Sequence, residues 1–319
     1  MSTTTKGIRR FAIAIPLITL FSLLLSACSG SSYATDPIPK TSKYVMGKFN
    51  GGQFLDAFTP GKPEAGITLE AMVQLSALGY DAKKQAKAIS WAKSHTDLFD
   101  SIGLKATYVF AAHSLGFAED STVRKASDEM IAGINGDGSI TGSNNFVYSW
   151  VLFALLAEHE KQLANNVALH LSTLSETDGG YKYVQGDPKS TAAADVTAFA
   201  LLALKASLGT SADNQDESTK EFAVSKAKTW LTSNETDGTH WTSYGDIDVS
   251  GTSYAIMALT AMNVDVDSAR TWLSSRISPT DGGVSAPWTE PAGDLFSSAQ
   301  ALLALSKLSF IDVLNHNLD

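Results

Sequence analysis

Apolar and polar residues alternate along this chain in a unit that recurs several times. Each unit begins with a stretch whose apolar residues fall three or four apart, such as Ala223, Ala227 and Trp230, while Lys226 and Lys228 lie on the other face. That spacing predicts an amphipathic helix with one face in water. Each unit ends in a stretch that is apolar nearly all round, which a helix tolerates only when neighbours cover it. The alternation predicts an outer layer of half-exposed helices and an inner layer of buried ones.

The closing leucines of the units give the spacing of the repeat. They are Leu78, Leu115, Leu155, Leu204, Leu259 and Leu305. Neighbouring members lie 37 to 55 residues apart, which is the period of a helical-pair repeat. The last inner stretch is as apolar as the middle ones, although an open solenoid needs polar terminal repeats. We therefore expect an all-α domain over residues 43–319, an (α/α)6 toroid of six helical hairpins.

The N-terminus has the pattern of a secretory leader. Lys6, Arg9 and Arg10 precede the apolar stretch 11–25, and the tetrapeptide 25–28 ends in the only cysteine, Cys28. This tetrapeptide, Leu-Ser-Ala-Cys, resembles the lipobox of bacterial lipoproteins. The resemblance implies cleavage after a signal peptide of residues 1–27, lipidation of Cys28 and anchoring on the extracytoplasmic side of the cell membrane. The alternative is a transmembrane anchor, for which the apolar stretch is short.

Residues 28–42 are rich in Ser, Thr and Pro and are expected to form a flexible tether. Removing the leader takes away three basic residues and no acid, so the net charge changes from -9 to -12. Nucleic acid is therefore not expected as a partner. With one cysteine, which we expect to be acylated, neither a disulfide nor a thiolate zinc site is expected. The histidines show no metal-binding spacing, and no phosphate loop or dinucleotide fingerprint is present, so no cofactor is expected.

Asp-Gly turns separate the two halves of several units. Around Asp137-Gly138 the spacing of an EF-hand loop would place Gly133 and Asn144 at its first and last positions, so calcium by that motif is excluded. We expect each Asp to accept backbone hydrogen bonds and each Gly to take a positive φ where the chain reverses. Recurrence in four units favours a structural role.

Differences between the units indicate where a site lies. Nine residues before each closing Leu, only the fourth unit carries an acid, Asp195, at the start of an inner helix. A carboxyl in an apolar cavity has a raised pKa and can serve as a catalytic proton donor. The alternative is an acid that satisfies the N–H groups at a helix N-terminus.

Long loops of the last three units carry aromatic residues beside acids, a combination suited to ligand binding. The candidate ligand-binding residues are Tyr181, Tyr183, Trp241, Tyr244, Asp248 and Trp288. Alternatively, aromatic residues after the turns fill the gap between adjacent pairs, an alternative we weigh for Tyr181 and Trp241. The polar insertion 209–220 is expected to be a solvated loop.

The chain resembles the terpenoid cyclase and protein prenyltransferase superfamily, whose shared element is an α/α toroid. Trp230-Leu231, Asp237-Gly238 and Trp241 resemble a QW repeat of squalene-type cyclases, with Glu235 in place of the Gln. Prenyltransferases use an Asp-Cys-His zinc site, for which no cysteine is available. Cyclases use Asp-x-Asp-Asp-Thr-Ala, of which residues 193–198 keep the central acid, Asp195, which the resemblance would make the proton donor.

Two other relatives share the toroid. The thioester domains of complement-like proteins have a Cys-Gly-x-Gln that is absent here. The α-domain of cobalamin carriers is a non-catalytic toroid, although the carriers add a small β domain.

The leader and the ring together favour a non-catalytic, membrane-anchored lipoprotein. Its toroid would bind a small-molecule or lipid-like ligand, with a membrane transporter or surface protein as a further partner. One alternative is an enzyme, either a cyclase using Asp195 or a polysaccharide-active (α/α)6 enzyme using a pair of acids at the mouth. A further alternative is a purely structural role as a surface interaction protein.

Overall fold

The computed structural model describes residues 39–243 and 245–318, which form one compact unit. The expected signal peptide, Cys28 and Tyr244 lie outside the described residues. Six helices form an inner layer: α2 (Ala65–Ser76), α4 (Ile102–Ser114), α6 (Asn145–Ala157), α8 (Ala194–Ala206), α10 (Val249–Ala261) and α12 (Leu295–Leu305). The outer helices are α1 (Pro39–Lys48), α3 (Ala86–Ser94), α5 (Ser121–Ala132), α7 (Lys161–Thr173), α9 (Asn214–Ser233) and α11 (Asp267–Ser275). Short additions are η1 (Thr96–Leu98), β1 (Thr242–Ser243), β2 (Asp246–Ile247) and α13 (Phe310–Leu318).

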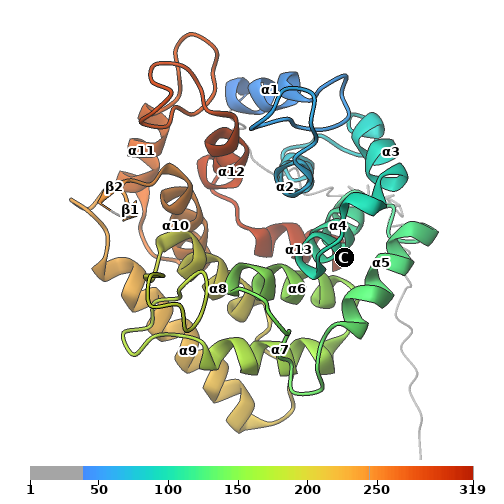
Figure 1. Cartoon of the computed structure of the whole chain (residues 1–319). Helices are drawn as coiled ribbons and strands as arrows, with labels where there is room; N and C mark the ends of the chain where they lie inside the picture. Colours follow the sequence, from blue (N-terminus) through green and yellow to red (C-terminus); the bar gives the residue numbers. More distant parts are fainter. Residues whose placement is uncertain (1–38, 244, 319) are drawn as a thin grey trace, which may run out of the picture. The chain divides into compact units, whose positions relative to one another are not determined.

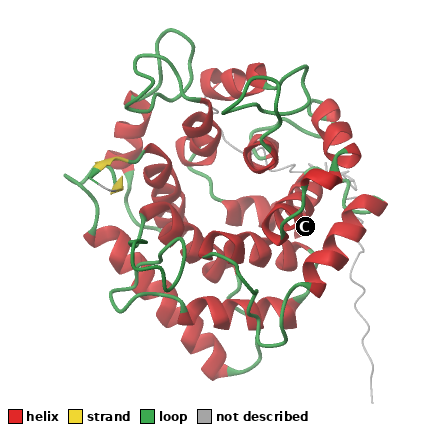
Figure 2. Ribbon diagram, in the orientation of Figure 1, coloured by secondary structure: helices red, strands yellow, loops and turns green. Residues whose placement is uncertain are grey.

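Within this unit the helices form two concentric rings (Figures 1 and 2). Each inner helix packs against the next, and α12 packs against α2, so the inner ring closes. The inner helices are more deeply buried than the outer ones, as the pattern of polar and apolar residues predicts. Every residue of α8 from Val196 to Leu204 is buried, whereas α11 buries only Ala269 and Leu273. The expected (α/α)6 toroid is confirmed.

The Asp-Gly turns are structural. The Asp178 carboxylate accepts a hydrogen bond from the backbone N–H of Gly180, and Gly179 has a φ of +96°. A Cβ on Gly179 would lie 2.5 Å from the backbone oxygen of Lys226 in the outer helix of the next pair. A Cβ on Gly138 would lie 2.1 Å from the backbone oxygen of Asn166 in α7. The turn at Asp178-Gly179 thus has the hydrogen-bonded Asp and the positive-φ Gly that the structural interpretation predicted, and both glycines also pack against the following pair.

A turn of the same kind joins the last helical pair to the first and so closes the ring. Gly282 packs against Lys40 of α1, and its carbonyl accepts a hydrogen bond from Thr41 Oγ1 at 3.0 Å. Tyr44 Oη donates to the carbonyl of Gly293 at 2.8 Å. Helix α1 therefore begins at Pro39, and residues 39–42 belong to the ring rather than to the expected tether, because Thr41 and Ser42 are buried.

Helix α13 covers the interior of the ring at the C-terminal ends of the inner helices. It packs against α2, α4, α6 and α8. Its first residue, Phe310, is fully buried, with its ring 5.3 Å from that of Trp150 and 5.4 Å from that of Phe199. Within the described part of the chain, α13 therefore covers the interior at this end. Among the described residues no single helix is long and apolar enough to cross a membrane, although the bent pair α12 and α13 reaches that length and composition together.

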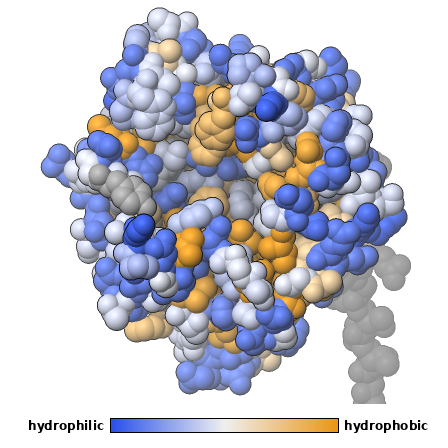
Figure 3. Space-filling model, in the orientation of Figure 1, coloured by the Kyte–Doolittle hydropathy of each residue, from blue (hydrophilic) through white to orange (hydrophobic). Residues whose placement is uncertain are grey.

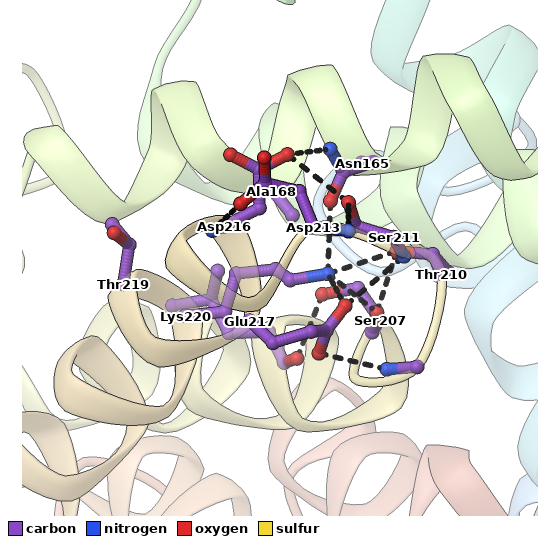
Figure 4. A network of polar contacts seen from close by, with 12 residues as sticks. Asn165, Ala168, Ser207, Thr210, Ser211, Asp213, Asp216, Glu217, Thr219 and Lys220 are labelled. Carbon is purple, nitrogen blue, oxygen red and sulfur yellow. Dashed lines mark hydrogen bonds and ion pairs between the residues drawn. The ribbon is translucent and has the colours of Figure 1, made fainter.

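The insertion expected to be a solvated loop is mostly helical. Asp213 caps α9, and the first turns of α9 bury Lys220 completely. The Lys220 ammonium donates to Asn165 Oδ1 at 2.9 Å and to Glu217 Oε1 at 2.7 Å (Figure 4). It also donates to Thr210 and to the Ser207 carbonyl. The loop prediction was wrong because these polar residues satisfy one another inside the fold rather than in water.

Candidate functional site

A cavity of about 310 Å³ lies at the N-terminal ends of four inner helices, α2, α4, α6 and α12. Its lining residues are Glu64, Gly66, Ile67, Glu70, Ser101, Gly103, Leu104, Thr107, Asn144, Phe146, Val147, Trp150, Tyr183, Phe296 and Gln300. The face drawn in Figure 3 is hollowed near the centre of the ring, with hydrophobic residues around the hollow. The size and the mostly apolar wall with a few polar groups are typical of a small-molecule site.

Glu70 is the buried acid of this cavity. It lies in the middle of α2, a helix that is otherwise largely apolar, and is only 5% exposed. Its Oε1 accepts hydrogen bonds from Tyr254 Oη at 2.7 Å and from Gln74 Nε2 at 3.0 Å. Burial raises the pKa of Glu70 to about 7, although these hydrogen bonds oppose the shift. Glu70 is therefore protonated in a large fraction of molecules near neutral pH.

The hydrogen bonds also distinguish the two carboxyl oxygens. Oε1 already accepts two donors, whereas Oε2 accepts only a longer one from Gln300 Nε2 at 3.3 Å. A proton on the neutral acid is therefore expected on Oε2. Gln300 is itself 5% exposed, and its Oε1 has no hydrogen-bond partner among the described residues. A buried amide oxygen without a partner is costly.

Asp195 lies in the first turn of α8, one turn before Phe199 and on the same face. Its pKa is raised to about 6, first by burial and second by the negative charge of Asp248. Its Oδ1 accepts the backbone N–H of Val196 at 2.8 Å, as expected for an acid at a helix N-terminus. Asp195 is not among the residues that line the cavity. The structure thus gives it a raised pKa and also the contacts of the structural alternative.

The structure brings one of the predicted aromatic residues to the cavity. Tyr183 lines it and is half exposed, because the segment before α8 folds over the start of α6. There the backbone N–H of Asn145 donates to the Tyr183 carbonyl at 3.1 Å. Trp288 is 75% exposed and does not line the cavity. Asp248 caps α10 by accepting the N–H of Gly251 at 2.7 Å.

Tyr181 and Trp241 are placed as packing residues rather than as ligand contacts. Both are buried, and neither lines the cavity. The backbone N–H of Tyr181 donates to Thr197 Oγ1, and that of Trp241 donates to Thr252 Oγ1. Val284 occupies the equivalent place in the sixth pair and donates to Ser298. Side chains at this position fill the gap between a turn and its inner helix, whichever residue is present.

Sequence reasoning missed Glu70 because only one position of each inner helix, the place of Asp195, was compared. Thr68 of α2 and Thr197 of α8 hold equivalent places, since the Oγ1 of each accepts a backbone N–H from the segment before its helix. Glu70 lies two residues after Thr68, whereas Asp195 lies two residues before Thr197, so the comparison did not include Glu70. A signal was present, since Glu70 and Gln74 are two polar residues four apart in an apolar stretch.

Comparison with known proteins supports the fold. No family model matches the chain, and no curated protein matches it. A solved structure of a type II terpene cyclase from Scytonema matches with a TM-score of 0.64 and 14% identity, covering 85% of this chain and 96% of that one. An unsaturated glucuronyl hydrolase from Streptococcus agalactiae matches with a TM-score of 0.58 and 12% identity, covering 85% and 89%. A protein from Actinoplanes matches with a TM-score of 0.63 and 15% identity, and the match covers 85% of this chain and 98% of that one.

The chain has the α/α toroid fold. The cyclase and the hydrolase among its structural neighbours are both enzymes built on this ring. At this level of identity the likeness establishes the fold and leaves the chemistry to the residues of the cavity.

Proposed function

We propose that this protein is an enzyme that transfers a proton between Glu70 and a small, largely apolar substrate held in the toroid cavity. The observation that carries the proposal is a buried carboxyl, with a pKa raised to about 7, on the wall of an apolar cavity. A group whose pKa lies near the working pH is the most effective general acid or base. The expected non-catalytic ligand carrier would not require such a group.

The contacts of Glu70 suit both halves of a proton transfer. As an acid, Glu70 would donate from Oε2, the oxygen with the weaker hydrogen bond. The carboxylate left behind would keep the donors Tyr254, Gln74 and Gln300. Because these donors are in place before the reaction, little reorganisation is needed when the charge forms.

The structural neighbours favour an enzyme over a carrier, since a type II terpene cyclase and unsaturated glucuronyl hydrolases share the ring. In this proposal Glu70 replaces Asp195 as the principal proton-transfer group, because only Glu70 lines the cavity. We retain anchoring through Cys28 on the extracytoplasmic side of the membrane as part of the proposal, on the basis of its lipobox-like sequence.

Product analysis tests this function. The full-length chain would be incubated with linear polyprenols, followed by gas chromatography and mass spectrometry, and with unsaturated disaccharides, followed by ultraviolet absorbance. We expect Glu70→Gln to lower the rate of conversion at least ~100-fold, the usual contribution of a general acid or base. The matched variant Asp195→Asn should keep the rate within about tenfold of the wild type.

Two results would contradict the proposal. One is a Glu70→Gln variant with the wild-type rate. The other is the absence of conversion of both substrate classes together with stable binding of either one, which would favour the carrier.

A further inference from the structure

The wall of the cavity contains acidic residues and no basic ones. Two acids, Glu64 and Glu70, line it, while none of its lining residues is a Lys, Arg or His. Glu64 precedes α2 without capping it through its side chain. A carboxylate or phosphate ligand would therefore meet like charge in a site of low dielectric, where repulsion is strong.

Aromatic rings form much of the remaining wall. Phe146, Trp150, Tyr183 and Phe296 all line the cavity. At the rim, Phe58 is 71% exposed and has its ring 5.7 Å from that of Phe296. The faces of aromatic rings attract cations, most strongly where water is excluded.

The helix N-termini around the cavity could favour an anion instead, because their free N–H groups carry partial positive charge. Here some of these N–H groups are already occupied by side chains. Ser101 accepts the N–H of Leu104 in α4, and Asn144 accepts that of Val147 in α6. Asp294 accepts the N–H of Ser297 in α12 and adds a further negative charge. The caps therefore reduce the attraction that these termini exert on an anion.

Gln300 holds one of the two cavity acids in place. It lines the cavity, is more than nine-tenths buried and donates from its Nε2 to Glu70 Oε2 at 3.3 Å. The same cavity thus presents carboxyl groups and aromatic faces, both of which suit a ligand that carries positive charge.

We propose that the cavity binds an organic cation, an alkylated ammonium. The proposal rests on the proposed function in that it names the substrate class of the same site. The aromatic wall would surround the alkyl groups, and the carboxylate of Glu64, together with that of Glu70 where Glu70 is ionised, would balance the charge. Uronates and phosphorylated prenyl compounds would be excluded by the same residues, so of the two substrate classes in the activity assay only the uncharged polyprenols are expected to react.

Three probes of nearly equal shape test the charge preference. Choline carries a quaternary ammonium, 3,3-dimethylbutan-1-ol replaces its nitrogen by carbon, and 3,3-dimethylbutyrate is an anion. Binding to the full-length chain would be measured by isothermal titration calorimetry at about pH 8, where Glu70 is mostly ionised. We expect choline to bind ~10-fold more tightly than the neutral alcohol, the difference that cation–π contacts and charge pairing give in a partly desolvated site. The butyrate should bind most weakly.

Variants at the rim locate the site without disturbing the core. Tyr183 is half exposed and Glu64 is partly exposed, so Tyr183→Leu and Glu64→Gln should fold normally, which circular dichroism would verify. Each should reduce the preference for choline over the alcohol by about threefold or more. Phe222→Leu is the matched control, because Phe222 is an exposed aromatic residue on outer helix α9.

The proposal is overturned if the alcohol or the butyrate binds as tightly as choline, if none of the probes binds, or if the rim variants keep the full preference. These outcomes are separate from those of the activity assay. Choline binding does not require turnover, so it can be retained when Glu70→Gln shows no effect on catalysis. Conversely, a Glu70-dependent conversion with no charge preference would overturn only the cation site.

Discussion

At the scale of single residues, two acids inside the ring have raised pKa values for partly different reasons. Burial dominates for both, but at Asp195 the charge of Asp248 adds to it, whereas at Glu70 three hydrogen-bond donors oppose it. Glu70 is held by partners from α2, α10 and α12, while the backbone hydrogen bonds to the Asp195 carboxylate come from its own turn. A fixed carboxyl in an apolar cavity is the better prepared proton-transfer group.

The raised pKa of Glu70 predicts how stability depends on pH. The folded protein holds this proton up to about pH 7, whereas an unfolded Glu releases it near 4.5. Folding therefore binds a proton in that window, and the free energy of unfolding should fall as pH rises from about 4.5 to 7. We expect Glu70 to account for a decrease of roughly 3 kcal/mol in the free energy of unfolding over this pH range. In the Glu70→Gln variant that decrease should be absent.

Urea denaturation at several pH values measures this slope. Glu119→Gln is the control, since the Glu119 side chain is 97% exposed. Asp195 contributes in the same direction between about pH 4 and 6, so part of the slope should remain in Glu70→Gln. Equal slopes in the wild type and in Glu70→Gln would show that Glu70 is ionised in the folded protein at these pH values.

At the scale of elements, the Asp-Gly turns share one sequence motif but differ in how closely their glycines pack against the next helical pair. The glycines of three turns press on the outer helix of the following pair, but a Cβ added at Gly238 would have no neighbour within 4 Å. All four have positive φ, so each tolerates a side chain poorly. At the three packed turns a side chain would also clash with the neighbouring helix, so there glycine is required for a second reason.

This difference predicts unequal costs for the same substitution. Gly238→Ala should lower the free energy of unfolding by about 1 kcal/mol, the strain of a left-handed backbone with a Cβ. Gly179→Ala should lower it by more than about 3 kcal/mol, because backbone atoms of α9 must also move. Thermal and urea unfolding of the pair would measure both. Equal losses would mean that the contact between the turn and α9 adjusts without cost.

The pattern of polar and apolar residues predicted these elements well, and its failures have physical causes. Inner helices are apolar on nearly all sides and outer helices on one face only, and this difference can be recognised in the local sequence. Lys220 escaped prediction because its burial depends on Asn165, Ser207 and Thr210, residues brought together only by the fold. Gln300 and Glu70 are likewise 230 residues apart, and nothing local indicates that they meet.

At the scale of the whole ring, closure removes the free ends that an open stack of helical pairs would have. Helix α1 packs on α12, and the contacts of Thr41 and Tyr44 join the first pair to the last loop. Each pair then has two neighbours, so no pair can leave the ring without exposing two apolar faces.

We therefore expect the ring to unfold as one cooperative unit. Hydrogen exchange monitored by mass spectrometry should give α4 and α10, on opposite sides of the ring, the same opening free energy. Tyr44→Phe removes one of the closing hydrogen bonds and should lower both values together by about 1 kcal/mol. Early exchange of either helix alone would instead indicate independent repeats, as in a solenoid.

The position of α13 also bears on the kinds of substrate that the proposed enzyme would take. Phe310 is fully buried and packs against Trp150, which lines the cavity, so among the described residues it covers the inner end of the cavity. In the proposed function a substrate would therefore enter and leave on the side of the helix N-termini, and a polymer would not be threaded through the ring. A molecule small enough to enter whole, or the terminal group of a longer one, would reach Glu70.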